Sequence, residues 1–428
     1  MAKAKKKENL TPEERLQAAL VPDWEQPYKV PENWCWTYLK PISKIRTGKK
    51  DANYGSVDGE YPFFTCAAEP IRCHGYSFDC NAILLAGNGD INNISRYNGK
   101  FEAYQRTYVV EIIEPISIDY VFYWFKYRWF DFNKDKMFGT AIPYIRLGNL
   151  QEFPIPVPPL TQQQRIVDRI ESLFAKLDEA KQKAQDALDS FETRKAAILH
   201  KAFTGELTAQ WRKEHDVGME SWAKKRFDEV ATIKSNLVDP ATFPDFPHIA
   251  PDNIEKKTGV LLEYHTVSED GVTSGKHRFY PGQILYSKIR PYLSKVVVVD
   301  FDGLCSADMY PIEAKGNTKC LWYYMLSEEF LEQASTAGSR SVLPKINQKE
   351  LSALTVVLPT LSDEQTEIVH ILDDLLAKEQ QAKEAAEAVL EQIDLVKKSI
   401  LARAFRGELG TNDPAEESAV ELVKDIIS

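Results

Sequence analysis

The sequence lacks the features that mark membrane, secreted and disulfide-stabilised proteins. Its 428 residues contain no run of eighteen apolar residues, so we expect no membrane span. The first residues, MAKAKKKENL, are rich in lysine, but no apolar segment follows them, and this is unlike a secretory signal. Six cysteines are too few for a disulfide framework in a chain of this length. We therefore expect a cytoplasmic protein with two or more domains.

Motifs of enzymes that act on nucleic acids are also missing. The chain has no Gly-x-x-x-x-Gly-Lys-Ser/Thr phosphate loop and no Asn/Asp-Pro-Pro-Tyr motif of an amino-methyltransferase. The Gly-x-Gly in LLAGNGDI lacks a third glycine, so we interpret it as a turn, and the acids of PDNIEKK are too closely spaced for a nuclease site. Cys66, Cys73, His74 and Cys80 lack the Cys-x-x-Cys spacing of a zinc site. We predict no catalytic residue and no metal in this chain.

The charge is acidic overall but unevenly distributed. A net charge of −10 by itself argues against nucleic acid as a ligand, because phosphates are bound by basic surfaces. However, LKPISKIRTGKK and GKHRFYPGQILYSKIRPYLSK contain several basic residues and no acidic residue. Local basic surfaces on an acidic chain are therefore compatible with this composition.

The chain does contain an internal repeat. KAAILHKAFTGELT, from Lys195, recurs as KKSILARAFRGELG, from Lys397, 202 residues later. Each copy ends a segment without proline in which apolar residues alternate at steps of three and four, a heptad pattern in which Arg194 and Glu379 are the exceptions. Such segments predict two helices of about 42 residues, roughly 60 Å long, that cover one another. The predicted seam residues are Ile166, Ile170, Leu173, Leu177, Phe191, Ile198, Ile368, Leu372, Leu375, Val389, Ile393 and Ile400.

The ends of the two helices and the segments before them also match. Thr161 and Ser362 are suitable N-caps, and Gly205 and Gly407 stand where a helix C-terminus favours a left-handed residue. IPYIRLGNL matches LPKINQKEL and AILLA matches QILYS, both at an offset of 201. The alternative, two unrelated coiled coils of similar composition, does not explain this shared offset. We predict two half-length units, each with a mixed α/β domain and a long helix. The two units share the matched motifs as a common frame, and the sequences between these motifs differ.

These ordered motifs carry a resemblance to a known family. From about Val30 to Leu409, the chain resembles the specificity subunit of type I restriction–modification systems, through VPENW, GQILYSKIRP, IPYIRLGNLQEFPIPVPPLTQQQRIV and the paired FTGELT and FRGELG. The resemblance implies an α+β fold in which two target-recognition domains are separated by two long antiparallel helices, with a pseudo-two-fold repeat. The expected segments are an N-terminal extension (1–29), a first recognition domain (30–158), a central long helix (159–204), a linker (205–220), a second recognition domain (221–358), a distal long helix (359–409) and a C-terminal tail (410–428).

The resemblance also implies a function without catalysis in this chain. Each domain would recognise one half of a split sequence in double-stranded DNA, and the helix pair would set the gap between the halves. The helices would also dock two modification subunits that carry the S-adenosylmethionine site, and restriction subunits with ATP and Mg²⁺ would join them. This chain would hold no cofactor itself.

Candidate DNA contacts follow from the chemistry of base and phosphate recognition. Base edges are recognised by Arg, Lys, Asn, Gln or hydroxyl groups on a rigid frame, and phosphates by positive charge. For any one candidate the alternative is a solvated surface charge. The candidates are Lys49, Lys50, Arg72, Asn88, Arg96, Tyr144 and Arg146 in the first domain, and Lys276, Arg278, Lys288, Arg290, Arg340 and Lys345 in the second.

Two other functions are compatible with the repeat. One is a stand-alone bivalent DNA-binding coiled-coil protein, such as a regulator or a scaffold, which would bind its site tightly without partners. The other is a scaffold that clamps two identical partners and binds no nucleic acid, against which the basic, acid-free stretches argue. Outside the repeat, TPEERLQAAL is predicted to form a short helix with a Thr11–Glu14 capping box.

Overall fold

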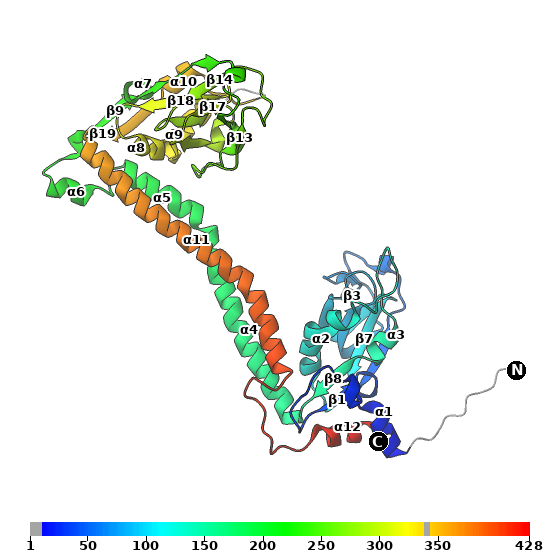
Figure 1. Ribbon diagram of the computed structural model, residues 1–428. Coiled ribbons are helices and arrows are strands. Elements are labelled where there is room, and N and C mark those ends of the chain that lie inside the picture. The colour runs from blue at the N-terminus through cyan, green and yellow to red at the C-terminus, as the bar shows by residue number, and fades with distance from the viewer. Residues whose placement is uncertain (1–10, 338–342) are drawn as a thin grey trace. The chain divides into compact units, whose positions relative to one another are not determined.

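The computed structural model describes residues 11–337 and 343–428, and these form two compact units (Figure 1). Unit 1 runs to Lys183 and resumes at Val389, and unit 2 comprises Ala184–Ala388. Each unit combines sheets with helices, which confirms the predicted α+β class. None of the described helices is long and apolar enough to cross a bilayer.

Unit 1 is built on a six-stranded sheet with the order β2-β7-β5-β6-β3-β4, in which only β3 and β6 pair in parallel. A separate antiparallel pair, β1 with β8, leads into the first long helix. The strands are β1 (Cys35–Tyr38), β2 (Ser43–Thr47), β3 (Tyr61–Phe64), β4 (Ile71–Cys73), β5 (Phe78–Ala86), β6 (Ile94–Ala103), β7 (Thr107–Ile112) and β8 (Pro154–Val157). The helices apart from the long pair are α1 (Pro12–Ala19), α2 (Ile118–Asn133), α3 (Leu147–Gln151) and α12 (Ala419–Ile427).

Helix α2 joins the sheet of unit 1 to strand β8. The Ser117 hydroxyl caps the helix by accepting a hydrogen bond from the amide of Tyr120. Tyr120 and Trp124 are buried, and their polar atoms donate to the carbonyls of Pro156 at 2.7 Å and Pro154 at 2.8 Å. Large aromatic residues can fill this core because each polar atom finds an acceptor on β8. The position of β8, and hence the start of the long helix, is fixed by the core.

Unit 2 has a similar plan, with a four-stranded sheet ordered β10-β18-β15-β16 and a five-stranded sheet ordered β11-β14-β17-β12-β13. The pair β9 and β19 takes the place of β1 and β8. The strands are β9 (Trp222–Arg226), β10 (Ala231–Ile233), β11 (Leu237–Val238), β12 (Pro247–Ile249), β13 (His265–Thr266), β14 (Lys276–Phe279), β15 (Ile284–Ser287), β16 (Val296–Val298), β17 (Gly303–Cys305), β18 (Met309–Ala314) and β19 (Thr355–Pro359). The helices are α6 (Ala209–Glu214), α7 (Phe227–Val230), α8 (Thr318–Met325), α9 (Glu328–Ala337) and α10 (Gln348–Ser352).

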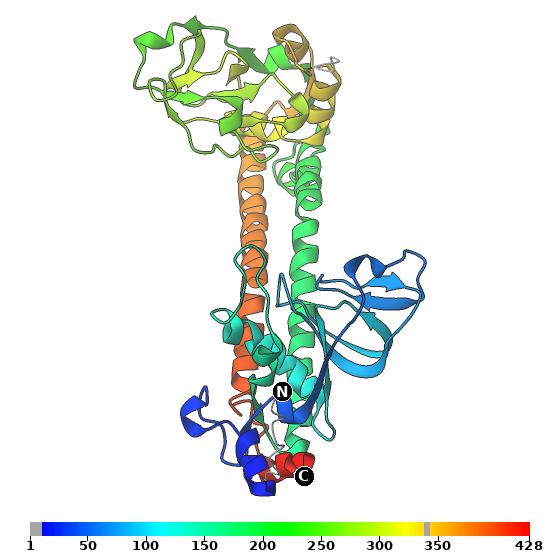
Figure 2. The same cartoon turned by 90° about the vertical axis from the view of Figure 1, so that its right-hand side faces the viewer.

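The long helices form an antiparallel pair in each unit (Figures 1 and 2). They are α4 (Leu160–Asp189), α5 (Phe191–Phe203) and α11 (Ser362–Ala404). In unit 1, Lys397 donates to Asp178 at 2.5 Å, and in unit 2 Arg194 donates to Glu379 at 2.8 Å. The two residues that interrupt the heptad patterns therefore neutralise each other. Gly205 and Gly407 have φ of +81° and +73°, so both are left-handed, as predicted at the helix ends.

Two details of the predicted helices are corrected. The first helix is not continuous, because Ser190 interrupts it between α4 and α5, where its hydroxyl donates to the carbonyl of Asp186 at 2.8 Å. The predicted N-cap Thr161 is two residues late, since α4 starts at Leu160, and the predicted N-cap Ser362 is one residue late, since α11 starts at Ser362 itself.

The predicted seam residues differ in how deeply they are buried. Ile166, Ile170, Ile368 and Leu372 are fully buried where the helix ends enter the domain cores. Phe191 and Ile393 are buried, and Leu173, Leu177, Ile198, Leu375 and Ile400 are half-buried. Val389 is 40% exposed, and Ala386 is the buried residue near it. Around Val389, away from the domain cores, α11 packs against a single partner helix. A contact between two helices buries a narrow stripe of side chains, and Val389 lies outside that stripe.

The N-terminal extension from Thr11 onward and the C-terminal tail both belong to unit 1. The Thr11 and Glu14 capping box is formed, and beyond α1 the amide of Val21 donates to the carbonyl of Trp36 at 2.9 Å. From the tail, Ala419 and Val423 are fully buried in the core, and Glu416 pairs with Arg165 at 2.8 Å. Residues 11–29 and 410–428 therefore both contribute to the core of this domain.

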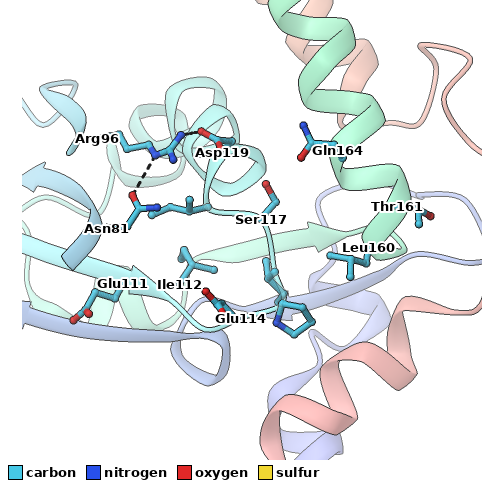
Figure 3. A pocket seen from close by; sticks show the side chains of 13 residues that line it. Asn81, Arg96, Glu111, Ile112, Glu114, Ser117, Asp119, Leu160, Thr161 and Gln164 are labelled. Carbon is cyan, nitrogen blue, oxygen red and sulfur yellow. Dashed lines mark hydrogen bonds and ion pairs between the residues drawn. The ribbon is translucent and has the colours of Figure 1, made fainter. Parts of the chain in front are cut away.

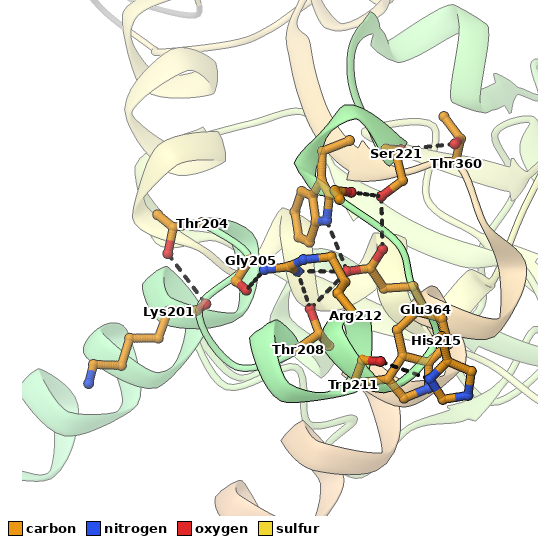
Figure 4. Close-up of polar contacts among 12 residues, drawn as sticks. Lys201, Thr204, Gly205, Thr208, Trp211, Arg212, His215, Ser221, Thr360 and Glu364 are labelled. Carbon is orange, nitrogen blue, oxygen red and sulfur yellow. Dashed lines mark hydrogen bonds and ion pairs between the residues drawn. The ribbon is translucent and has the colours of Figure 1, made fainter.

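The predicted linker of unit 2 is also a folded element. Its helix α6 places Arg212 against Glu364, with 2.8 Å between the guanidinium and the carboxylate, and the Glu364 side chain is fully buried (Figure 4). Thr208, Ser221 and Trp222 also donate to this carboxylate. Burial by itself would raise the pKa of Glu364, but the hydrogen bonds from Arg212, Trp222, Thr208 and Ser221 outweigh burial and hold that pKa below its usual range.

We expect Arg212→Ala to destabilise unit 2 by about 3 kcal/mol, because it leaves a buried carboxylate without its cation. Urea unfolding near neutral pH would measure the change. Lys378→Ala, which breaks the exposed pair of Lys378 with Asp374 in the same unit, is the control and should have no measurable effect. A similar small effect for both variants would contradict the assignment.

The Glu364 carboxylate also predicts a pH dependence. Since its folded pKa is lowered, its contribution to stability is present above the usual glutamate pKa of about 4.3 and is lost as pH falls through the lower folded pKa. Glu364→Gln should therefore flatten the acid side of the stability profile. An unchanged acid profile would show that Glu364 is not the group responsible.

Candidate nucleic-acid interface

The turn after β5 and the segment before α3 form a pair of loops in unit 1. The amide of Gly89 donates to the carbonyl of Pro143 at 2.9 Å, and the amide of Ile145 donates to the carbonyl of Gly87 at 2.9 Å. Asn88 and Tyr144 form a β-bridge between these bonds. We call residues 87–90 with 143–146 the recognition loop pair of unit 1. It brings together three sequence-predicted residues, Asn88, Tyr144 and Arg146.

Unit 2 has the same loop pair at the repeat positions, 288–291 with 344–347. The amide of Arg290 donates to the carbonyl of Pro344 at 2.7 Å, and that of Ile346 donates to the carbonyl of Lys288 at 2.9 Å. Ile289 and Lys345 form the corresponding bridge. The predicted residues Lys288, Arg290 and Lys345 therefore meet at the equivalent place.

Arginine and aromatic rings determine the chemistry of the loop pair in unit 1. The Arg146 guanidinium carbon lies 3.8 Å from the centroid of the Phe138 ring, and its Nη2 donates to the Tyr144 hydroxyl at 3.2 Å. Arg106 approaches the other ring of this cluster, with its guanidinium 5.9 Å from the centroid of Tyr144. Arg146 and Arg106 are both exposed. The surface is positively charged and can stack against a planar group.

A carboxylate between two lysines determines the chemistry of the loop pair in unit 2. Asp308 accepts from Lys345 at 2.9 Å and lies 3.7 Å from Lys288. The hydrogen bond from Lys345 is the main reason that the pKa of Asp308 lies below its usual range. Burial, and then the charge of Lys345, lower the pKa of Lys288. Lys288, Lys345 and Asp308 together carry one net positive charge, but both ammonium groups are engaged by the Asp308 carboxylate.

The other candidates of the first domain lie elsewhere. Lys49 and Arg72 are exposed, and the Lys50 ammonium lies 4.3 Å from the centroid of the Tyr54 ring. Arg96 is paired with Asp119 in a cleft of about 770 Å³, where its Nε also donates to Asn81 (Figure 3).

That cleft is a poor site for phosphate. Glu111 and Glu114 also line it, so its acids outnumber its single arginine. An acidic cleft repels phosphate, and the charge of Arg96 is already neutralised by Asp119. Arg96 therefore lies in the cleft and not in the recognition loop pair of unit 1, and its charge is not available for a phosphate.

Of the remaining candidates of the second domain, one is buried, one is half-buried among aromatic rings, and one is not placed. Lys276 is 6% exposed, and its ammonium donates to the carbonyl of Ser274 at 2.9 Å. The Arg278 guanidinium lies 4.9 to 5.6 Å from the centroids of three rings, those of Tyr280, Phe243 and Phe246. Arg340 lies outside the described residues.

The loop pairs offer hydrogen-bond donors, positive charge and aromatic faces. Within the described parts of the chain, no group of three His, Cys, Asp or Glu side chains could hold a metal ion. An array of donors on a rigid frame can bind an anionic polymer and contact base edges.

Comparisons with known proteins identify the family of this chain. A family model described as the type I restriction modification DNA specificity domain matches residues 31–188 and 219–392. The specificity subunit of the type I restriction enzyme EcoDI from Escherichia coli is 41% identical over 410 residues, which cover 91% of each chain. The chain belongs to the specificity subunits of type I restriction–modification systems. Membership favours this function over that of a stand-alone DNA-binding coiled coil.

Further relatives of the specificity subunit are more distant. The EcoKI specificity subunit of E. coli strain K12 is 24% identical over 307 residues, covering 65% of this chain and 62% of that protein. The crystal structure of the HsdS subunit from Thermoanaerobacter tengcongensis has a TM-score of 0.63 at 19% identity, over 90% of this chain and 100% of that chain. This likeness supports the fold of two domains with long helices.

Sequence reasoning missed the residues that support the loop pairs. Phe138 and Arg106 lie outside the motifs that match between the repeats, and only an aromatic residue before Gly139 could have suggested the stack. Asp308 gave no signal, because its partners Lys288 and Lys345 are distant in sequence and are brought to it by β18 and the loop pair.

We expect Asp308→Asn to strengthen binding to duplex DNA of any sequence, because Lys288 and Lys345 become free for phosphates. The slope of log K against log salt should steepen by about one. Fluorescence anisotropy at several salt concentrations would measure it. Asp300→Asn removes an exposed carboxylate of the same domain that forms none of these contacts, and is the control. Equal slopes for the two variants would show that only net charge changed.

Proposed function

We propose that this specificity subunit recognises a split sequence in double-stranded DNA, with one half contacted by each recognition loop pair. The observation that carries the proposal is the equivalent loop pair in the two domains, built with the same backbone hydrogen bonds but different side chains. In unit 1 the second loop presents Tyr144 and Arg146, and in unit 2 the same positions are Lys345 and Asn347. Different side chains on one frame support two different half-sites.

The helix pair is proposed to set the gap between the half-sites. Helix α11 is continuous over 43 residues, and ion pairs fix its register against α4 in unit 1 and against α5 in unit 2. Half-sites on one duplex must be spaced according to its helical repeat, of about 34 Å per turn. Helices hold such a spacing better than a flexible linker does.

The helix ends are proposed to dock two modification subunits. A cleft of about 460 Å³ in unit 1 is lined by Asp394, Lys397 and Leu401, and one of about 580 Å³ in unit 2 by the repeat-equivalent residues Glu192, Lys195 and Leu199. Two equivalent clefts support two copies of one partner. S-adenosylmethionine, and ATP with Mg²⁺, would be held by the modification and restriction subunits, so that this chain acts in the cytoplasm without catalysis.

The first experiment co-expresses the chain with its modification subunit in a host whose own methylation is removed, and sequences the methylated bases. A split motif with a constant gap supports the proposal. Methylation that is absent, or that falls on one continuous motif and persists without this chain, overturns it in favour of the independent DNA-binding scaffold.

Shortening both long helices by one heptad should shorten the gap. Deleting 180–186 from α4 and 388–394 from α11, counted inward from the Asp178–Lys397 pair, preserves the apolar pattern. Seven residues of helix are about 10 Å, so we expect a gap shorter by up to about three base pairs with both half-sites unchanged. Methylome sequencing gives both quantities. An unaltered gap in an active complex would contradict the spacer role.

A further inference from the structure

We propose that one arginine in each domain, Arg146 in unit 1 and Arg290 in unit 2, recognises a guanine in its own half-site. This inference rests on the proposed function and adds the specificity-determining residues. Both residues are exposed on the recognition loop pairs. In the described part of the chain, neither side chain is paired with a carboxylate. A fixed arginine can donate two parallel hydrogen bonds to O6 and N7 of guanine, the commonest specific contact in the major groove.

The Arg146 guanidinium is held by two aromatic residues. It stacks at 3.8 Å on Phe138 and lies 5.8 Å from the centroid of Tyr144, whose hydroxyl accepts one hydrogen bond from Nη2. A guanidinium has five N–H donors, so this contact leaves the others for a ligand. Stacking restricts rotation of the group, and a bidentate contact depends on such a fixed orientation.

The frame around Arg146 is tied to the core of unit 1. Phe138 and Tyr144 exchange two backbone hydrogen bonds of 2.9 Å across a turn that contains Gly139. Gly139 has φ of +82°, and a Cβ there would approach the carbonyl oxygen of Ile142 to 2.7 Å. The turn therefore requires glycine at this position.

The backbone of Arg146 is fixed as well. Its amide donates to the Asn149 side chain at 2.9 Å, and Asn149 in turn donates to Asn133 at 2.9 Å. Asn133 is fully buried. The backbone and the guanidinium of Arg146 are thus both positioned before any ligand binds.

Arg290 has an unfavourable backbone conformation where the other repeat has glycine. Its φ is +48° and its ψ is 59°, in the left-handed region, and Pro291 follows it. The equivalent residue of unit 1, Gly89, has φ of +73°, and a Cβ there would meet nothing within 4 Å. A left-handed arginine costs free energy that glycine would not, and a following proline further restricts the residue before it. Asp216, Lys257 and Ser294 also have positive φ, so the backbone alone does not assign a function. The strain at Arg290 supports one because the equivalent position of the other repeat is glycine and the side chain is exposed on the loop pair.

Phosphate contact alone does not account for these features. A phosphate needs only positive charge, and exposed lysines such as Lys49 and Lys349 supply it without an aromatic stack or a strained backbone. Fixed orientation is what a base edge requires. Because Arg146 belongs to the second loop of its pair and Arg290 to the first, the two guanines would stand at different places in their half-sites.

The test is the methylome of the full complex, with Arg146→Ala and Arg290→Gly made separately. Arg146→Ala should lower the preference for guanine at one position of the first half-site by about ten- to a hundredfold, leaving the second half-site unchanged. Arg290→Gly should lower the preference for guanine at one position of the second half-site and leave the first half-site unchanged. Since glycine relieves the backbone strain, the melting temperature of the Arg290→Gly variant should equal or exceed that of the wild type. A purely structural role for Arg290 predicts no loss of specificity with this variant.

Three controls separate the outcomes. Lys176→Ala on α4 and Lys224→Ala on β9 remove exposed cations that are not among the candidate DNA contacts, and both variants should leave both half-sites unchanged. Phe138→Ala tests a positioning residue and should relax the same position as Arg146→Ala. The inference is overturned if the arginine variants keep the wild-type motif, or if methylation falls without any change in sequence preference. If the wild-type complex gives no split motif, the proposed function itself fails.

Discussion

The rest of the structure depends on the need to cover the apolar stripes of the long helices. A helix of 43 residues with such a stripe is not stable in water by itself. Within unit 2, the first turns of α11 bury Ile368 and Leu372 in the same core as Leu199 and Phe203 of α5. Within unit 1, the last turn of α11 buries Leu401 and Ala404 with Ile170 of α4, and Phe405 directly after the helix joins the same core. Each domain core is therefore completed by helix ends from both repeats, and neither domain has a complete core without the long helices.

This dependence explains the polar groups along the helices. Away from the domains the stripe narrows to alanines such as Ala184 and Ala386, which contribute little apolar area. There, Arg194 and Glu379 occupy seam positions and pair with each other. One polar pair in an apolar seam disfavours shifted registers, because any shift would leave both charges without partners. The pair thus specifies the alignment where apolar packing is too weak to do so.

The features that follow from local rules could be predicted from the sequence, and those that depend on tertiary partners could not. Heptads and the glycines at positions 205 and 407 predicted the two long helices and their ends. The matched segments around Pro143 and Pro344 predicted that the two domains share a common frame. The interruption at Ser190 was not predictable, because a serine in a heptad pattern is compatible with a continuous helix. Nor was the pairing of Arg96 with Asp119, which are neighbours only after β6 and α2 have packed.

The recognition loop pairs show why frame and content can differ so much between the repeats. Their shared contacts use backbone atoms: the amides of Gly89 and Arg290 bond to the carbonyls of Pro143 and Pro344. Backbone hydrogen bonds do not depend on side-chain identity, except where proline removes a donor or φ is positive. The side chains between these bonds are therefore largely free to vary without loss of the frame. At position 290 an arginine side chain is present although the backbone there has an unfavourable left-handed conformation. Here the side chain is retained at the expense of backbone stability, and selection for DNA recognition is the simplest physical reason.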